Sequence, residues 1–170
     1  MALNPAAMLS GFVWQVFTYM FAHADISHLL VNMLGLFIFG TAVERSMGSK
    51  EFLLFYLLTG TLAGIASFGI YVATGSWYTM LLGSSGAVYA LLLAFAVLNP
   101  EARIFLYGIL PVRAPVLVLG YAGIEILSQL LSFRSSIAHL THLAGFLWSW
   151  LYFIIRFGIN PAKRLFGPRR

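Results

Sequence analysis

The sequence predicts an all-α membrane protein that folds as one helical bundle, and three observations support this class. Of its 170 residues, 61% are hydrophobic and only 9% are charged, and the mean hydropathy is +0.90. Because a soluble domain carries about 25% charged residues, this chain cannot cover a water-facing surface. Its apolar runs are separated by short polar turns, as in a multi-span membrane protein.

Five transmembrane helices are expected, together with a less regular beginning and end. The first 26 residues are rich in aromatics but interrupted by Asn4-Pro5 and Ser10-Gly11, which indicates an irregular or interfacial segment. Asp25 or Ser27 can cap the first span. Residues 101–111 read as a mixed linker, with room for a short interfacial helix, and residues 132–136 read as a turn. The five spans are expected at residues 27–43, 52–74, 85–98, 115–131 and 137–155.

The domain organisation follows from these spans and from the basic residues. Nine of the ten Lys and Arg residues fall in three regions that alternate crossing puts on one side, and only Arg134 falls on the other. The positive-inside rule makes that shared side cytoplasmic. We therefore expect a single domain over residues 1–170, with an external loop-like segment (1–26), a helical core (27–155) and a basic cytoplasmic tail (156–170).

Composition also excludes several functions. The chain has no cysteine, so it can form no disulfide, thiolate nucleophile or thiolate metal site. Its net charge of +5 is explained by loops and a tail that meet anionic lipid head groups, so a nucleic-acid partner is not needed.

Four polar side chains are predicted to lie at one depth in the membrane. Ser85 begins a span on the external side, and His142 lies about six residues into the last span, roughly 9 Å below its start. His28 and Asn32 enter with the first span and share a helix face. Polar groups at membrane depth are costly and usually face a cavity or one another.

These residue types can support nucleophilic chemistry. A neutral imidazole at His142 can take the proton of Ser85, whose oxygen then attacks a carbonyl. His28, Asn32 and the backbone N–H of Ser85 can donate hydrogen bonds to a developing oxyanion. Tyr89, four residues after Ser85, can stack on His142 and hold its ring.

Each residue alone also has a structural interpretation, as a helix cap, an interhelical hydrogen bond or an interfacial aromatic. Gly145 is interpreted as a small residue for close helix contact, and His23 and His139 more often have structural roles. Glu125 is the one carboxylate expected to be buried, but its spacing ties it to no other residue. The sequence therefore favours a Ser–His dyad over a triad with an acid.

The motifs resemble those of the rhomboid family of intramembrane serine proteases. Gly83-Ser84-Ser85-Gly86 is similar to the family's GxSG motif, and His142-Leu143-Ala144-Gly145 to its HxxG-type motif. The segment from His23 to Asn32 resembles the HxxxxHxxxN segment, and Gly40 with Glu44-Arg45 resembles a GxxxER-like helix end. The resemblance runs from about Trp14 to Gly145. It implies Ser85 and His142 as catalytic residues, His28 and Asn32 in the oxyanion hole, Tyr89 as the histidine-stacking residue, and Gly83, Gly86 and Gly145 as motif glycines.

The chain departs from the family pattern in two ways. The family's external loop often has a Trp-Arg pair, and here the pair is Trp14-Gln15, so the anchoring of that loop is expected to differ. The five spans correspond to helices two to six of a six-helix core. We therefore expect this chain to fold but to cleave poorly compared with one bearing an added N-terminal membrane helix.

The resemblance implies a serine-type endopeptidase that cleaves transmembrane segments of membrane proteins by a Ser–His dyad. It implies no cofactor and no metal, partners limited to membrane-protein substrates and the lipid bilayer, and a multi-pass protein of a bacterial inner membrane. One alternative is a catalytically inactive relative that binds membrane helices. Another, from the residues alone, is a haem or metal protein whose ligands are His23, His28, His139 and His142.

Overall fold

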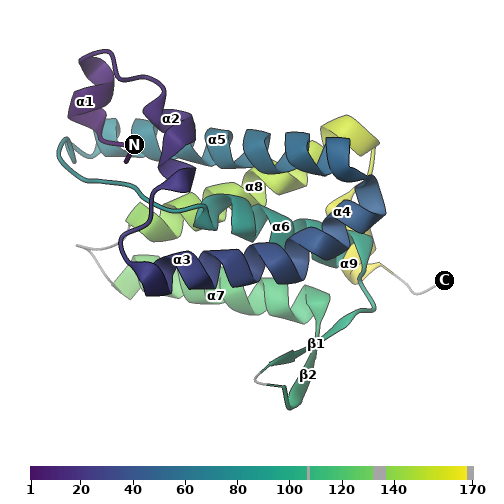
Figure 1. Cartoon of the computed structure of the whole chain (residues 1–170). Coiled ribbons are helices and arrows are strands. Elements are labelled where there is room, and N and C mark those ends of the chain that lie inside the picture. The colour runs from purple at the N-terminus through teal and green to yellow at the C-terminus, as the bar shows by residue number, and fades with distance from the viewer. Residues whose placement is uncertain (107, 132–136, 168–170) are drawn as a thin grey trace.

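The body of the molecule is a bundle of apolar helices that run alongside one another (Figure 1). The computed structural model describes residues 1–106, 108–131 and 137–167. The first bundle helix is a continuous run of α3 (Ile26–Gly35), a π-helical turn η2 (Leu36–Gly40) and α4 (Thr41–Met47). The others are α5 (Ser49–Ala73), α6 (Ser85–Leu98), α7 (Ala114–Leu131) and α8 (Ile137–Phe157). The predicted turn at 132–136 lies outside the described residues.

Within the part of the chain that the structure describes, four helices are long and apolar enough to cross a membrane. They cover Ile26–Met47, Ser49–Ala73, Ala114–Leu131 and His139–Phe157. The third expected span, α6, has the predicted bounds but only 14 residues, or about 21 Å at 1.5 Å per residue. A hydrocarbon core is about 30 Å thick, so at least one end of α6 lies inside that layer.

Helix α6 is the centre of the bundle and packs against α5, α7, α8 and η2. It carries no charged residue, and its alanines allow neighbouring helices to come close. A helix that is apolar on all sides belongs in a protein interior. The buried residues of α6 are Gly86, Ala87, Ala90, Leu91, Leu92, Leu93, Ala94, Phe95, Ala96 and Val97.

The tightest approach in the bundle is between α6 and α8, at Gly86 and Gly145. A Cβ atom built on Gly145 would lie 2.1 Å from the carbonyl oxygen of Gly86, so any side chain there would force the two backbones to shift. A Cβ on Gly86 would lie 3.1 Å from the Cβ of Ala63 on α5, so α6 is held closely on two sides. This agrees with the predicted packing role of Gly145.

The N-terminal segment is more regular than the sequence predicted. It forms α1 (Pro5–Leu9), α2 (Gln15–Thr18) and a 3₁₀ turn, η1 (Tyr19–Phe21). The segment lies against a glycine face of α5, where Tyr19 donates a hydrogen bond of 2.8 Å to the carbonyl of Gly60. A side chain at Gly64 would collide with the ring of Tyr19. Gly60 and Gly64 therefore allow the N-terminal segment to pack closely against α5.

Gln15 anchors the N-terminal segment at the position where the family pattern often has arginine. Its side chain is 8% exposed, and its Oε1 accepts a hydrogen bond of 2.9 Å from the backbone N–H of Asn4. Leu3 then pairs with Leu81 through two backbone hydrogen bonds, of 3.0 and 2.9 Å. The start of the chain is thereby joined to the strand-like residues that lead into α6.

The predicted linker at 101–111 is a β-hairpin, so the expectation of an interfacial helix there was wrong. Strands β1 (Arg103–Leu106) and β2 (Leu110–Arg113) pair antiparallel, with Arg103 opposite Arg113. The run Arg-Ile-Phe-Leu favours a strand, and Gly108, with φ of 72°, supplies the turn. Pro111 is tolerated because a two-stranded ribbon has only edge strands.

The basic residues that the structure describes gather at one end of the bundle. Figure 1 shows the α4–α5 turn, the hairpin and the short helix α9 (Pro161–Phe166) at that end, and the N-terminal segment at the other. Arg156 belongs to the last turn of α8, where its Nε donates a 2.8 Å hydrogen bond to Glu51 of α5. The helical core therefore extends to Phe157, and part of the predicted tail is the helix α9.

Replacing Gly145 by Ala is expected to lower the melting temperature in detergent. The added methyl forces α6 and α8 apart, and overpacking of this kind costs about 1–3 kcal/mol. This outweighs the roughly 1 kcal/mol by which Ala exceeds Gly as a helix former. The matched control is Gly69→Ala in α5, where a Cβ meets no atom within 4 Å, so its melting temperature should be unchanged or higher. Equal melting of Gly145→Ala and the wild type would contradict this account of the contact.

Candidate active site

A sharp turn delivers Ser85 to the first position of α6. Gly83 has φ of +96°, a conformation that favours glycine, and its N–H donates a 3.1 Å hydrogen bond to the carbonyl of Tyr19. A Cβ on Gly83 would lie 2.6 Å from Nε2 of His28. The turn therefore requires glycine for its backbone angle and for the closeness of α3.

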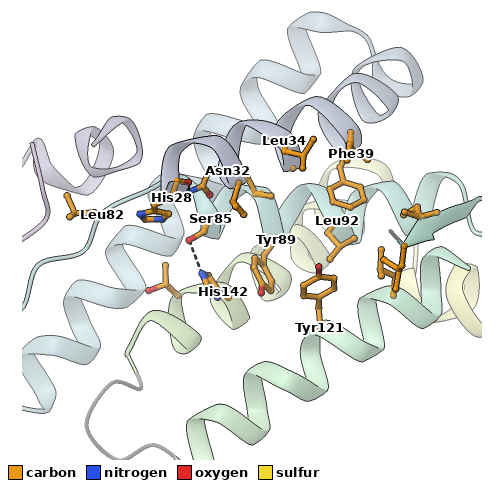
Figure 2. A pocket seen from close by; sticks show the side chains of 18 of the residues that line it. His28, Asn32, Leu34, Phe39, Leu82, Ser85, Tyr89, Leu92, Tyr121 and His142 are labelled. Carbon is orange, nitrogen blue, oxygen red and sulfur yellow. Dashed lines mark hydrogen bonds between the residues drawn. The ribbon is translucent and has the colours of Figure 1, made fainter. Parts of the chain in front are cut away.

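Ser85 and His142 are in hydrogen-bond contact across the α6–α8 interface. The Oγ of Ser85 lies 2.8 Å from Nε2 of His142, and both side chains are half-buried (Figure 2). The contact is possible because Gly86 and Gly145, one and three residues further along, let the two backbones approach.

Tyr89 covers the ring of His142. The two rings are nearly parallel, with centroids 4.2 Å apart and an interplanar angle of 6°. Phe146 meets Tyr89 edge-on, with centroids 5.2 Å apart. The imidazole is thus held in one plane by residues one turn along on α6 and α8.

Glu125 of α7 is also part of the site, which corrects the expectation that its spacing ties it to no other residue. Its Oε1 lies 2.9 Å from Nδ1 of His142, and its Oε2 lies 2.5 Å from Nδ1 of His139. The hydroxyl of Tyr89 donates a further, short hydrogen bond to Oε1. The carboxylate is 4% exposed, so these donors take the place of water around it.

His28 and Asn32 approach the site from α3. Figure 2 shows them on the side of Ser85 opposite His142. Nε2 of His28 faces Gly83, while Nδ1 lies 3.4 Å from the backbone N–H of Ala24. Asn32 is 3% exposed and donates a 2.9 Å hydrogen bond to the carbonyl of His28.

The start of α3 is fixed by Asp25, one of the two predicted caps. Its Oδ1 accepts hydrogen bonds from the backbone N–H of His28 at 2.8 Å and from the Ser27 hydroxyl at 2.5 Å. These bonds hold the pKa of Asp25 below its ordinary value of 3.8. The ring of His23 meets that of His28 edge-on, with centroids 5.2 Å apart. The partial burial of His23, and secondly the charge of the neighbouring His28, lower the pKa of His23.

A cavity of about 590 Å³ opens between α3 and α7 and has α6 as its floor. His28, Asn32, Ser85 and His142 all line one part of it, and the remainder is mainly apolar. The hairpin closes its far end with Ile104 and Leu106. Ser84, although adjacent to Ser85, is 1% exposed and does not line this cavity.

Glu125, His139 and His142 could in principle hold a metal ion, because their ligand atoms lie within 4.8 Å of one another. Ligands 2.0–2.1 Å from a tetrahedral ion are about 3.3 Å apart. The observed 2.5 and 2.9 Å separations between nitrogen and oxygen are instead those of hydrogen bonds. His23 and His28 do not belong to this group.

The structure brings together Ser85, His142, Tyr89, His28 and Asn32 around one cavity. Sequence reasoning missed Glu125 and the involvement of His139. One signal could have found them, namely a lone carboxylate inside a span, followed by a span with histidines three residues apart. An uncompensated charge in the membrane calls for such partners.

The fold and the site define a polytopic helical membrane protein with a serine, a histidine and a carboxylate in hydrogen-bond contact among its helices. The model of the Rhomboid domain matches residues 10–159, and the chain belongs to the rhomboid family.

Several relatives illustrate the range of the family. RHOMBOID-like protein 12, mitochondrial, of Arabidopsis thaliana is 35% identical over 150 residues, covering 80% of this chain and 44% of that protein. Rhomboid protease GluP of Bacillus subtilis (strain 168) is 40% identical over 91 residues, covering 54% of this chain and 17% of that protein. Presenilin-associated rhomboid-like protein, mitochondrial, of Rattus norvegicus is 34% identical over 84 residues, covering 49% and 22%. The chain spans less than half the length of each.

These relatives bear on the predicted location. The spans support an integral membrane protein. The bacterial inner membrane is not supported, because the relative from Arabidopsis thaliana, which matches 80% of this chain, is named as mitochondrial.

Replacing Asp25 by Ala is expected to lower the melting temperature at neutral pH, because α3 loses its cap. Since the pKa of Asp25 is lowered in the folded protein, the cap stabilises fully above the ordinary pKa of 3.8 and is lost as the pH falls through the lower, folded-state pKa. The melting difference between wild type and Asp25→Ala should therefore shrink in acid. Asp25→Asn, which caps without titrating, is the control. A difference that does not change with pH would contradict the assignment.

Proposed function

We propose that the protein is an intramembrane serine endopeptidase that cleaves transmembrane segments of membrane proteins. The observation that carries this proposal is the 2.8 Å contact between Ser85 Oγ and His142 Nε2. The contact lies at the start of a helix too short to cross the membrane and opens on a cavity. Membership of the rhomboid family and similarity to a relative named as a rhomboid protease support the same reaction class.

The proposed reaction proceeds through an acyl-enzyme. Ser85 Oγ attacks the carbonyl carbon of the scissile peptide while its proton moves to Nε2 of His142. The C–N bond then breaks, and His142 gives that proton to the leaving amine. A water molecule repeats the sequence on the ester, with His142 again as the base, and releases the new carboxyl end with Ser85 restored.

The developing oxyanion is assigned to His28, Asn32 and the backbone N–H of Ser85. Both α3 side chains approach Gly83, two residues before Ser85, and both line the same cavity as its hydroxyl. The N–H of Ser85 is at the N-terminus of α6, where backbone donors are unpaired and the helix dipole favours negative charge. An amide and an imidazole N–H fit this role because both can donate.

The substrate we propose is a membrane-spanning segment that unwinds locally before cleavage. The cavity is mainly apolar, so it suits a chain arriving from lipid. An α-helix hides its carbonyls in internal hydrogen bonds, so the scissile region must be extended. Small or helix-breaking residues near the cleavage point should therefore favour turnover.

The alternative is an inactive rhomboid-like protein that binds membrane helices, since several relatives are named only rhomboid-like. The contact of Ser85 with His142 favours the protease, because binding a helix would not require it. In either case the partners are membrane proteins and the bilayer.

We also propose a single domain whose basic end faces the cytoplasm and whose N-terminal segment faces outward. The gathering of the basic turn, hairpin and α9 at one end of the bundle supports this orientation (Figure 1).

Replacing Ser85 by Ala is expected to abolish cleavage of a transmembrane reporter and labelling by a fluorophosphonate probe. The matched control is Ser84→Ala, which should retain substantial activity because Ser84 does not line the cavity. Both variants should still insert into the membrane. A dispensable Ser85, or an essential Ser84, would overturn the assignment of the nucleophile.

Replacing His28 or Asn32 by Ala is expected to slow cleavage by roughly 10²–10³-fold each, the usual effect of removing one oxyanion donor. The loss should be in kcat more than in KM, because the donors act on charge that develops in the transition state. Reporter turnover in liposomes measures both constants. Unchanged kcat in the single variants and in the double variant would remove α3 from the mechanism.

A further inference from the structure

Glu125 occupies a costly position for an acidic side chain. It is the one buried residue between Leu119 and Leu131, a stretch of α7 that the structure describes in full. The other residues of that stretch are exposed or half-buried, and most of them are apolar. A carboxylate inside a span is expensive unless its oxygens are bonded within the protein.

The surroundings of Glu125 consist of donors to both oxygens. Oε1 accepts from the Tyr89 hydroxyl and faces Nδ1 of His142 at 2.9 Å, while Oε2 faces Nδ1 of His139 at 2.5 Å. With Oε1 bound from α6 and α8 and Oε2 bound from α8, both oxygens of the carboxylate are fixed in place. Two of the three donors, Tyr89 and His142, also stack on each other.

This arrangement determines which nitrogen of His142 carries the proton. An ionised carboxylate can only accept hydrogen bonds, so the nitrogen that faces it, Nδ1, bears the hydrogen. In the neutral ring Nε2 is then an acceptor, and it is Nε2 that lies 2.8 Å from Ser85 Oγ. The hydroxyl of Ser85 therefore points its proton at a lone pair, as a general base requires.

We infer that Glu125 is a positioning residue that holds His142 in the Nδ1–H tautomer and stabilises the imidazolium formed when Ser85 attacks. The inference rests on the proposed function for its catalytic consequence. It makes the site a Ser85–His142–Glu125 triad in place of the dyad that the sequence favoured. His139 acts one step further out, by holding the second oxygen of Glu125.

Because Glu125 is on α7 and its partners are on α6 and α8, the tautomer also depends on α7 being packed against the bundle. Within residues 119–131, Glu125 is the one buried residue, and the ring of Tyr121 adds an edge-on contact with Tyr89 of α6. Displacement of α7 would remove the acceptor from Nδ1 and free the ring to take the other tautomer.

The test compares Glu125→Gln with Gln129→Ala, a control one turn along the same face of α7. The glutamine keeps the size of the side chain, but its amide can donate to Nδ1 and so permits a proton on Nε2. We expect kcat to fall by roughly 10²- to 10⁴-fold, the upper value being the loss when a triad carboxylate becomes an amide. KM and melting temperature should change little, and Gln129→Ala should behave as wild type.

A second readout reports the tautomer directly. In protein labelled with ¹⁵N-histidine, nitrogen chemical shifts distinguish Nδ1–H from Nε2–H, and a His142→Ala spectrum assigns the signal. We expect Nδ1–H in the wild type and a shift toward Nε2–H in Glu125→Gln. His139→Gln should cause a smaller change in the same direction.

The outcomes separate the two proposals. If the wild type neither cleaves reporters nor is labelled at Ser85, the proposed function fails, and the tautomer measurement alone decides the role of Glu125. An unchanged tautomer in Glu125→Gln overturns the inference, even where activity falls, because the effect would then be structural. Cleavage by Glu125→Gln within about threefold of the wild type overturns it as well.

Discussion

The contact of α6 with α8 across Gly86 and Gly145 is the constraint on which the arrangement of the site depends. With the backbones this close, the first residue of α6 and the second turn of α8 face each other at hydrogen-bond distance. The same approach stacks Tyr89 on His142, because Tyr89 lies one turn beyond Ser85 on the same face. A larger residue at either glycine would separate these pairs together. The glycines therefore matter to the chemistry through distance, although neither has a functional group.

Because the interior of the bundle offers little water, a polar side chain can be buried there only if another side chain or the backbone takes its hydrogen bonds. Membrane helices gain little from hydrophobic contact with one another, since lipid solvates apolar side chains equally well, and polar contacts matter correspondingly more. In this bundle the imidazoles of His139 and His142 and the hydroxyl of Tyr89 satisfy the carboxylate of Glu125, and Ser85 completes the chain. A network in which every member has a partner holds each ring in a single orientation. Membrane burial thus fixes the orientation of these side chains, and the transfer of a proton from Ser85 to His142 needs the same fixed orientation.

Much of the bundle could be predicted from the sequence because span length, breakers and capping residues are local signals. The bounds of α6 and the capping of α3 by Asp25 follow from a few neighbouring residues. The closeness of Ser85 and His142 could be anticipated from equal depth, since depth depends only on the rise per residue. Glu125 could not be placed in this way, because its contact with His142 depends on the axial position and the rotation of α7 relative to α8. The hairpin was missed for a related reason: its two short strands form only by pairing with each other, which no single segment reveals.

The isolated carboxylate on α7 has a consequence for how the protein is made. During synthesis α7 reaches the membrane before α8, so Glu125 enters without the histidines that later surround it. An acidic residue at the centre of a lone helix opposes insertion by about 2.5–3.5 kcal/mol on the scale measured for aspartate. Helix α8 carries the compensating imidazoles but has the lowest mean hydropathy of the four long spans, 1.2. Each of the two helices is therefore a weak membrane segment by itself, and insertion as a hairpin lets the carboxylate of α7 enter the bilayer already hydrogen-bonded to the imidazoles of α8.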